Sequence, residues 1–168
     1  AMLDEFKASV SGLVEIPSDD AVAAHLQTLS AVKVRAPIIY QAALEGERFA
    51  GFADFLILDA SGCYQIWDTK LARSPKPYYA VHLGCYSEMF SATTGETMPE
   101  KFGIILGNMD RAEFRVEDFI HYYRRVKASF LAMQDGFAGN WAERPEPLAG
   151  ADYGRWTSDA EKFFDDSD

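Results

Sequence analysis

Apolar positions recur at helical spacing in the first part of the chain. The spacing of Leu3, Phe6 and Val10 predicts a helix that is already under way at the start, with no capping residue before it. We therefore expect the chain to be part of a longer protein. Asp19 and Asp20 precede a second apolar-periodic stretch, which predicts a helix that packs on the core. Its apolar positions are Val22, Leu26 and Leu29.

Three stretches in the middle of the chain have the composition of strands. Apolar and β-branched residues dominate 37–44 and 49–58, and the polar residues 45–48 between them are turn-forming. Another turn is predicted at 59–62, after which residues 63–70 alternate between apolar and polar. These three strands are predicted to form an antiparallel meander.

The pattern then becomes mainly helical. Pro77 is suited to the first position of a helix that reaches about Phe90 and is apolar nearly all round, so we expect it to be buried against the sheet. A strand is predicted at 102–106 and a helix at 117–134, ended by Asp135 and Gly136. The predicted core positions of this last helix are Phe119, Ile120, Tyr123, Val126 and Phe130. The fold class is therefore α/β, with a central mixed sheet flanked by helices.

Composition fits one globular core. The chain has 168 residues, of which 48% are hydrophobic, enough to bury a substantial core. We predict one domain at 1–138 and an acidic tail at 139–168 that packs on it. The sequence has neither a long apolar run nor a signal peptide pattern, so we expect a cytoplasmic protein without a membrane partner. Cys63 and Cys85 are predicted to be buried free thiols.

Charge argues against general affinity for nucleic acid, because the net charge is −10. The distribution is uneven, however. Residues 143–168 hold eight acidic and three basic side chains, which is half of the net charge. Residues 69–87, in contrast, hold Lys70, Arg73 and Lys76 and no carboxylate. We predict that Arg73 and Lys76 bind phosphate.

Charged side chains interrupt apolar strand faces in the predicted meander. Alternation places Asp54 on one face with Phe52 and Leu56, and it places Asp68 and Lys70 together on one face of the next strand. Buried charges must pair or bind a cation. Two carboxylates suit Mg²⁺ or Mn²⁺, which can activate water and offset charge on a phosphate. The alternative is that one aspartate forms a plain ion pair with Lys70.

The segments around these residues, Gly51-x-x-Asp54 and Asp68-x-Lys70, resemble motifs of the RecB-like nucleases of the PD-(D/E)XK superfamily. The resemblance implies a restriction-endonuclease-like fold and a metal-dependent DNA nuclease, most simply an exonuclease acting on single strands. It assigns metal binding to Asp54, Asp68 and the Thr69 carbonyl, and it assigns assistance of the attacking water to Lys70. DNA and other domains of a longer parent chain are the implied partners.

The chain departs from that family in three places. The family's Gln-x-x-x-Tyr helix motif here reads His82 to Tyr86, two residues that share a helix face and can project together toward the site as accessory groups. The family also has a His-Glu pair on a helix just ahead of the point that corresponds to the start of this chain. This pair, which contributes to the metal site in the family, is absent here. The cysteines that bind an iron–sulfur cluster in related nucleases are also absent, so no such cluster is expected. Their places are taken by Ala151, Gly154 and Ala160.

These departures keep a second hypothesis open. The domain can instead be a catalytically impaired nuclease fold that binds nucleic acid or a protein partner. Other residue patterns offer no further enzyme class, because the sequence has no glycine-rich phosphate loop, no Gly-x-Ser-x-Gly elbow and no paired-cysteine zinc pattern.

Overall fold

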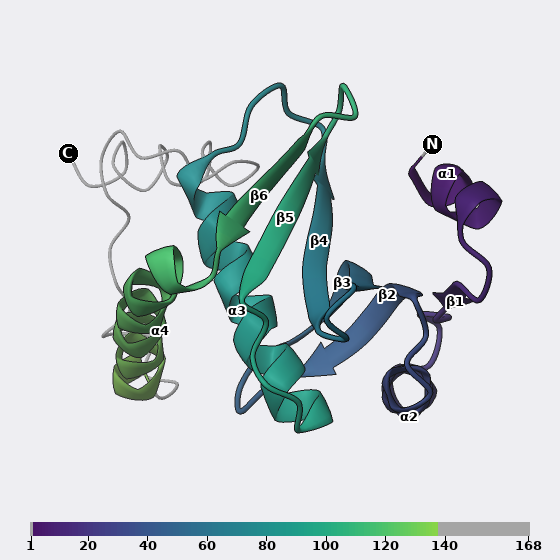
Figure 1. Ribbon diagram of the computed structural model, residues 1–168. Coiled ribbons are helices and arrows are strands. Elements are labelled where there is room, and N and C mark those ends of the chain that lie inside the picture. Colours follow the sequence, from purple (N-terminus) through teal and green to yellow (C-terminus); the bar gives the residue numbers. More distant parts are fainter. Residues whose placement is uncertain (1, 138–168) are drawn as a thin grey trace, which may run out of the picture. The chain divides into compact units, whose positions relative to one another are not determined.

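The computed structural model describes residues 2–137, which form an α/β fold built on a mixed six-stranded sheet (Figure 1). This confirms the predicted fold class. The elements are α1 (Met2–Ser9), β1 (Val14–Glu15), α2 (Ala21–Lys33), β2 (Ile38–Glu45), β3 (Ala50–Leu58), β4 (Tyr64–Lys70), α3 (Pro77–Thr94), β5 (Lys101–Leu106), β6 (Arg111–Arg115) and α4 (Glu117–Phe137).

The chain divides into two compact units, Ala1–Val126 and Lys127–Asp168. The whole sheet lies in the first unit. The expected tail at 139–168 lies outside the described residues, together with the positions where a cluster-binding nuclease would have cysteines. Among the helices in 2–137, none has the length and apolar character needed to cross a membrane.

Strand order in the sheet follows chain order. The predicted antiparallel meander of β2, β3 and β4 is confirmed, and each strand lies within one or two residues of its predicted range. β5 pairs with β4 in parallel, which makes the sheet mixed. Two strands were not predicted: β1, which pairs in parallel with β2, and β6, which pairs antiparallel with β5.

The ladder between β3 and β4 stops part of the way along the strands. Their paired positions run from Leu58↔Tyr64 to Phe55↔Trp67 and end there. Beyond this point, β4 continues with β5 alone, and β3 continues with β2. A fork therefore opens in the middle of the sheet, next to Asp54 on one strand and Asp68 on the other.

Helix α2 packs on the sheet through a different face from the one predicted. Asp20 caps it, accepting hydrogen bonds from the N–H groups of Val22 and Ala23 at 2.9 and 3.0 Å. Val22 and Leu26, however, are exposed. The buried positions are Ala24, Thr28, Ala31 and Val32. Small side chains let the helix approach β2 so closely that the Thr28 hydroxyl accepts a hydrogen bond from the Ala43 N–H at 2.9 Å.

Helix α3 is buried against the sheet, as predicted, and contacts β2, β3, β4 and β5. It begins at Pro77 and runs beyond the predicted end at Phe90 to Thr94, where Gly95 caps it in the left-handed conformation with φ 71°. Helix α4 continues to Phe137, so the predicted stop at Asp135 and Gly136 is wrong. Two of its predicted core positions, Val126 and Phe130, are exposed, whereas Ile120 and Tyr123 are buried.

A second, smaller cluster of apolar side chains covers the opposite face of the sheet. Met2 and Phe6 of α1 pack there against Phe55, Trp67 and Ile105. The rings of Phe6 and Phe55 meet edge to face, with centroids 5.0 Å apart. This contact fixes α1 beside the strands that carry Asp54 and Asp68. Both cysteines are free, but the prediction that they are buried is wrong, because Cys63 is exposed and Cys85 is half-buried.

Candidate functional site

The carboxylates of Asp54 and Asp68 face each other across the fork between β3 and β4. Each is the first residue beyond the last paired position of its strand. They lie close enough to interact, so the negative charge of Asp54 adds to the effect of burial in raising the pKa of Asp68. The structure therefore brings together the two carboxylates that interrupt the apolar faces of adjacent strands.

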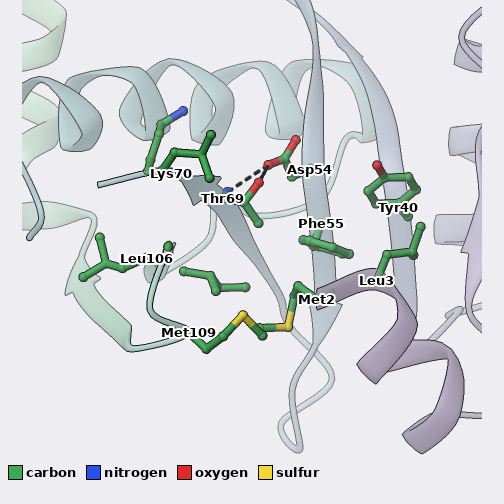
Figure 2. A pocket seen from close by; sticks show the side chains of 12 residues that line it. Met2, Leu3, Tyr40, Asp54, Phe55, Thr69, Lys70, Leu106 and Met109 are labelled. Atoms are coloured by element: carbon green, nitrogen blue, oxygen red, sulfur yellow. Dashed lines mark hydrogen bonds between the residues drawn. The ribbon is translucent and has the colours of Figure 1, made fainter. Parts of the chain in front are cut away.

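At the fork, hydrogen bonds to the Asp54 carboxylate take the place of backbone hydrogen bonds between β3 and β4. Its Oδ2 accepts hydrogen bonds from the Thr69 backbone N–H at 2.8 Å and from the Thr69 hydroxyl, as Figure 2 shows. Its Oδ1 accepts a third bond from the side-chain amide of Gln41 at 3.0 Å. Gln41 has a left-handed backbone with φ 56°, unusual for a residue other than glycine or asparagine. Three donors thus hold this carboxylate in one orientation.

Asp68 is the most deeply buried acid of the site, with 5% of its surface exposed. Burial raises its pKa to about 6, and the nearby Lys70 ammonium only partly opposes this shift. Lys70 Nζ forms an ion pair with Asp68 Oδ2. Apart from that ion pair, Oδ2 is buried and accepts no hydrogen bond. A buried carboxylate needs a compensating positive charge, which the Lys70 ammonium supplies for Asp68.

The ion pair expected by the simpler alternative is therefore present, but it accounts for only one of the two acids. Lys70 is largely buried, with 23% of its side chain exposed, and its ammonium lies 5.6 Å from the centroid of the Tyr79 ring. Its single charge cannot neutralise both Asp54 and Asp68.

His82 and Tyr86 of α3 reach the same site, as their helical spacing predicted. Their rings are in contact at a tilt of 50° with centroids 4.5 Å apart, and His82 Nδ1 lies 3.9 Å from Asp68 Oδ2. Burial and the neighbouring Lys70 charge lower the pKa of His82, which is therefore neutral at physiological pH. Burial and the two aspartates raise the pKa of Tyr86 to about 12, so its hydroxyl keeps its proton.

The glycine of the Gly-x-x-Asp motif, Gly51, has a steric role at the site. A side chain at this position would start with a Cβ only 3.2 Å from the Tyr86 hydroxyl oxygen. Absence of a side chain at Gly51 therefore leaves space for the Tyr86 ring beside the carboxylates.

Arg73 and Lys76 lie in the exposed segment between β4 and α3. The ammonium of Lys76 lies over the Tyr78 ring, 5.8 Å from its centroid, and Lys76 is the residue that precedes the first turn of α3. Within residues 2–137, neither side chain forms an ion pair with a carboxylate. Phosphate binding by these two residues stays a prediction, and no contact among residues 2–137 brings them into the fork.

Asp54 and Asp68 are the residues at the fork that could coordinate a divalent cation. Among residues 2–137, no group of three or more His, Cys, Asp and Glu side chains has the arrangement of a metal site. Magnesium, however, is commonly held by one or two carboxylates, with water and substrate oxygens completing its shell. Asp54 and Asp68 provide that number of carboxylates, although Asp68 Oδ2 is already paired with the Lys70 ammonium. Participation of the Thr69 carbonyl stays a prediction.

Sequence reasoning missed two residues near the fork. Gln41 gave no signal, because its contact with Asp54 depends on a left-handed backbone that no pattern of polar residues reveals. Met109, which also has a left-handed backbone with φ 70°, was not considered, although it lines the pocket that opens beside Asp54.

Comparison with models of known protein families and with curated protein sequences finds no match for this chain.

Proposed function

We propose that this chain is a metal-dependent nuclease that hydrolyses DNA phosphodiesters, with its sheet a version of the restriction-endonuclease-like fold. One observation carries the proposal: two carboxylates from adjacent strands meet at a fork beside a single lysine, whose ammonium pairs with the buried Asp68. The resemblance of Gly51-x-x-Asp54 and Asp68-x-Lys70 to the RecB-like nuclease motifs agrees with this arrangement.

Mg²⁺ or Mn²⁺ held by Asp54 and Asp68 would supply an activated water and would offset negative charge on the phosphate. Thr69 and Gln41 keep the Asp54 carboxylate oriented. If a cation took its place beside Asp68, Lys70 could hold the attacking water or a phosphate oxygen. The protonated hydroxyl of Tyr86 can donate a hydrogen bond to another phosphate oxygen, whereas neutral His82 can accept a proton.

Two further features support a nucleic-acid strand as the substrate. Residues 69–87 carry basic side chains without any acid, and Arg73 and Lys76 are exposed on the segment that leaves the fork. Phosphate contacts of this kind orient a strand without reading its sequence. A preference for single-stranded DNA and for cleavage from an end is proposed from the family resemblance.

The test is incubation of the protein with end-labelled single- and double-stranded DNA and Mn²⁺, beside the Asp68→Ala variant. We expect the wild-type protein to cleave the labelled strand and the variant to be inactive, because half of the metal-binding set is gone. Equal cleavage by both proteins, or none by either, contradicts the proposal.

A second candidate function is favoured by the ion pair itself. The Lys70 ammonium occupies the side of Asp68 where a cation would bind. If the cation cannot displace it, the domain is a binding module for nucleic acid or for another part of a longer protein. Calorimetric titration with Mn²⁺ separates the two functions: saturable binding that is lost in Asp68→Ala supports the nuclease, and absence of binding supports the module.

A further inference from the structure

An apolar pocket opens directly from the candidate catalytic groups. It has a volume of about 320 Å³ and is bounded at one end by Asp54, Thr69 and Lys70. Figure 2 shows these residues at one end of the pocket and Met2 and Met109 at the other. The remaining lining residues are mainly apolar: Leu3, Tyr40, Phe55, Leu71, Ile105, Leu106 and Gly107. Apolar walls with a few convergent polar groups are characteristic of sites for organic ligands.

Two lining side chains are exposed to water although both are large and apolar. Leu71 is completely exposed, and Met109 has 40% of its surface exposed. Met109 also has a left-handed backbone, a conformation that asparagine tolerates better than methionine. Strained residues of this kind occur preferentially at functional sites, where the surrounding structure maintains them.

The walls of the pocket are held in place by contacts outside it. The Gly107 N–H donates to the Ala72 carbonyl at 3.1 Å and ties the β5–β6 turn to the segment after β4. Arg111 of β6 pairs with Glu5 of α1 at 3.3 Å and lies over the Phe6 ring. The pocket is therefore formed before any ligand arrives, which reduces the entropy lost on binding.

We infer that this pocket binds the base of an unpaired nucleotide next to the phosphodiester that is cleaved. The inference rests on the proposed function, which places a phosphate at Asp54, Asp68 and Lys70. The next groups along the strand are a sugar and a base, and the surface available to them beside Asp54 is apolar. Every base has a flat face that apolar and aromatic side chains can cover.

Pairing and stacking cover a base within a duplex, so such a base cannot enter the pocket without being extruded. An unpaired base has both faces free. Leu71 and Met109 would thus favour single strands, because only an unpaired base can reach them in the pocket. The lining offers few polar groups beyond those at the fork, so we expect the pocket to accept different bases with little preference.

Binding of labelled single-stranded oligonucleotides tests this inference. Fluorescence anisotropy is measured in EDTA, which prevents cleavage, for a short thymidine oligonucleotide and for a set in which each member lacks one base. We expect one missing base to weaken binding about ten-fold and the others to have little effect, because a stacked base contributes at about this level. Equal affinity for the complete and all base-free oligonucleotides overturns the inference.

Variants assign the effect to the pocket. Leu71→Ser and Met109→Asn should weaken binding of the complete oligonucleotide about ten-fold and leave binding of the sensitive base-free one unchanged. Neither change threatens the fold, since Leu71 is fully exposed and asparagine suits the backbone of Met109. Leu26→Ser, at an exposed leucine on α2, is the matched control and should bind both as the wild type does.

Failure of this inference differs from failure of the nuclease proposal. Cleavage that needs Asp68, combined with binding that is insensitive to every missing base and to Leu71→Ser, refutes the base pocket alone. Absence of both cleavage and oligonucleotide binding refutes the two together.

Discussion

Asp54 and Asp68 sit side by side in different environments. Asp54 accepts hydrogen bonds from Thr69 and Gln41, whereas Asp68 is buried and relies on the Lys70 ammonium. Burial is the larger influence on Asp68, because its pKa is raised to about 6 in spite of the lysine. The folded protein is therefore less stable when Asp68 is ionised than when it is protonated. A bound cation would offset this loss of stability.

Stability without metal should fall as pH rises through the range where Asp68 ionises. Between its ordinary pKa near 4 and about 6, the folded state binds more protons than the unfolded state, so the free energy of unfolding decreases with pH. Asp68→Asn cannot ionise. In EDTA, we expect this variant to match the wild type near pH 4 and to be more stable by roughly 2–3 kcal/mol above pH 7.

Urea unfolding at several pH values measures this difference. The control is Asp19→Asn, at an exposed acid before α2, which should parallel the wild type at every pH. A constant difference between Asp68→Asn and wild type would mean that Asp68 does not ionise in this range.

Gln41 is expected to act by positioning Asp54. Gln41→Asn keeps an amide and tolerates the left-handed backbone, but its shorter side chain cannot reach the Asp54 carboxylate. We predict a roughly ten-fold lower cleavage rate at saturating Mn²⁺, because a misoriented metal ligand typically reduces activity by this order. Thermal unfolding should hardly change. A loss of cleavage that merely follows a loss of folded protein would contradict a positioning role.

At the scale of elements, the fork depends on tight contact between β4 and β5. Trp67 lies over Gly103, its partner across the parallel ladder, so closely that a Cβ on Gly103 would be 2.3 Å from the indole ring. Only glycine fits there. The bulky ring covers the backbone of β5 and packs with Phe55 and Ile105 on the α1 side.

Gly103→Ala should therefore destabilise the protein by about 1–3 kcal/mol, the usual effect of forcing a methyl group into a packed core. Gly107→Ala is a matched control in the same hairpin, since its nearest neighbour would be at an ordinary 3.6 Å. Chemical denaturation measures both. Equal stability of the two variants would contradict the packing described for Trp67.

Elements with strong periodicity could be predicted from sequence, and the weak ones could not. The meander follows from alternation, and the start of α3 follows from Pro77. β6 escaped prediction because an exposed edge strand needs few apolar residues. The buried face of α2 was misassigned because close packing on β2 favours Ala24 and Thr28 over the larger Val22 and Leu26.

Some features of the candidate site could likewise be predicted from sequence and others could not. Asp54, Asp68 and Lys70 could be predicted because charges interrupt apolar faces of adjacent strands. The fork that separates the strands, and the contact of Gln41 with Asp54, could not be predicted, because they depend on where a backbone ladder ends and on one left-handed residue.

At the scale of the whole molecule, the charge distribution sets the expected behaviour with nucleic acid. The net charge of −10 opposes binding, so contacts to phosphate must come from local groups such as Arg73 and Lys76. Affinity should then be modest and strongly dependent on salt.

Replacing Arg73 and Lys76 together by alanine should lower the dependence of log Kd on log salt by about two, since each phosphate contact contributes nearly one to this slope. This change in slope should not depend on the base sequence of the DNA. Anisotropy titrations over a range of salt concentrations measure it, with Lys33→Ala on α2 as the control. An unchanged slope would mean that neither Arg73 nor Lys76 contacts the phosphates of the DNA.

The central claim is that the fork between β3 and β4 is a metal-dependent nuclease site, and the initial rate of single-strand cleavage against Mn²⁺ concentration tests it most directly. The account predicts a rate that rises to saturation for the wild type and for Asp19→Asn, and that stays at background for Asp68→Asn. Cleavage by Asp68→Asn at the wild-type rate, or a wild-type protein inactive at every Mn²⁺ concentration, would contradict it.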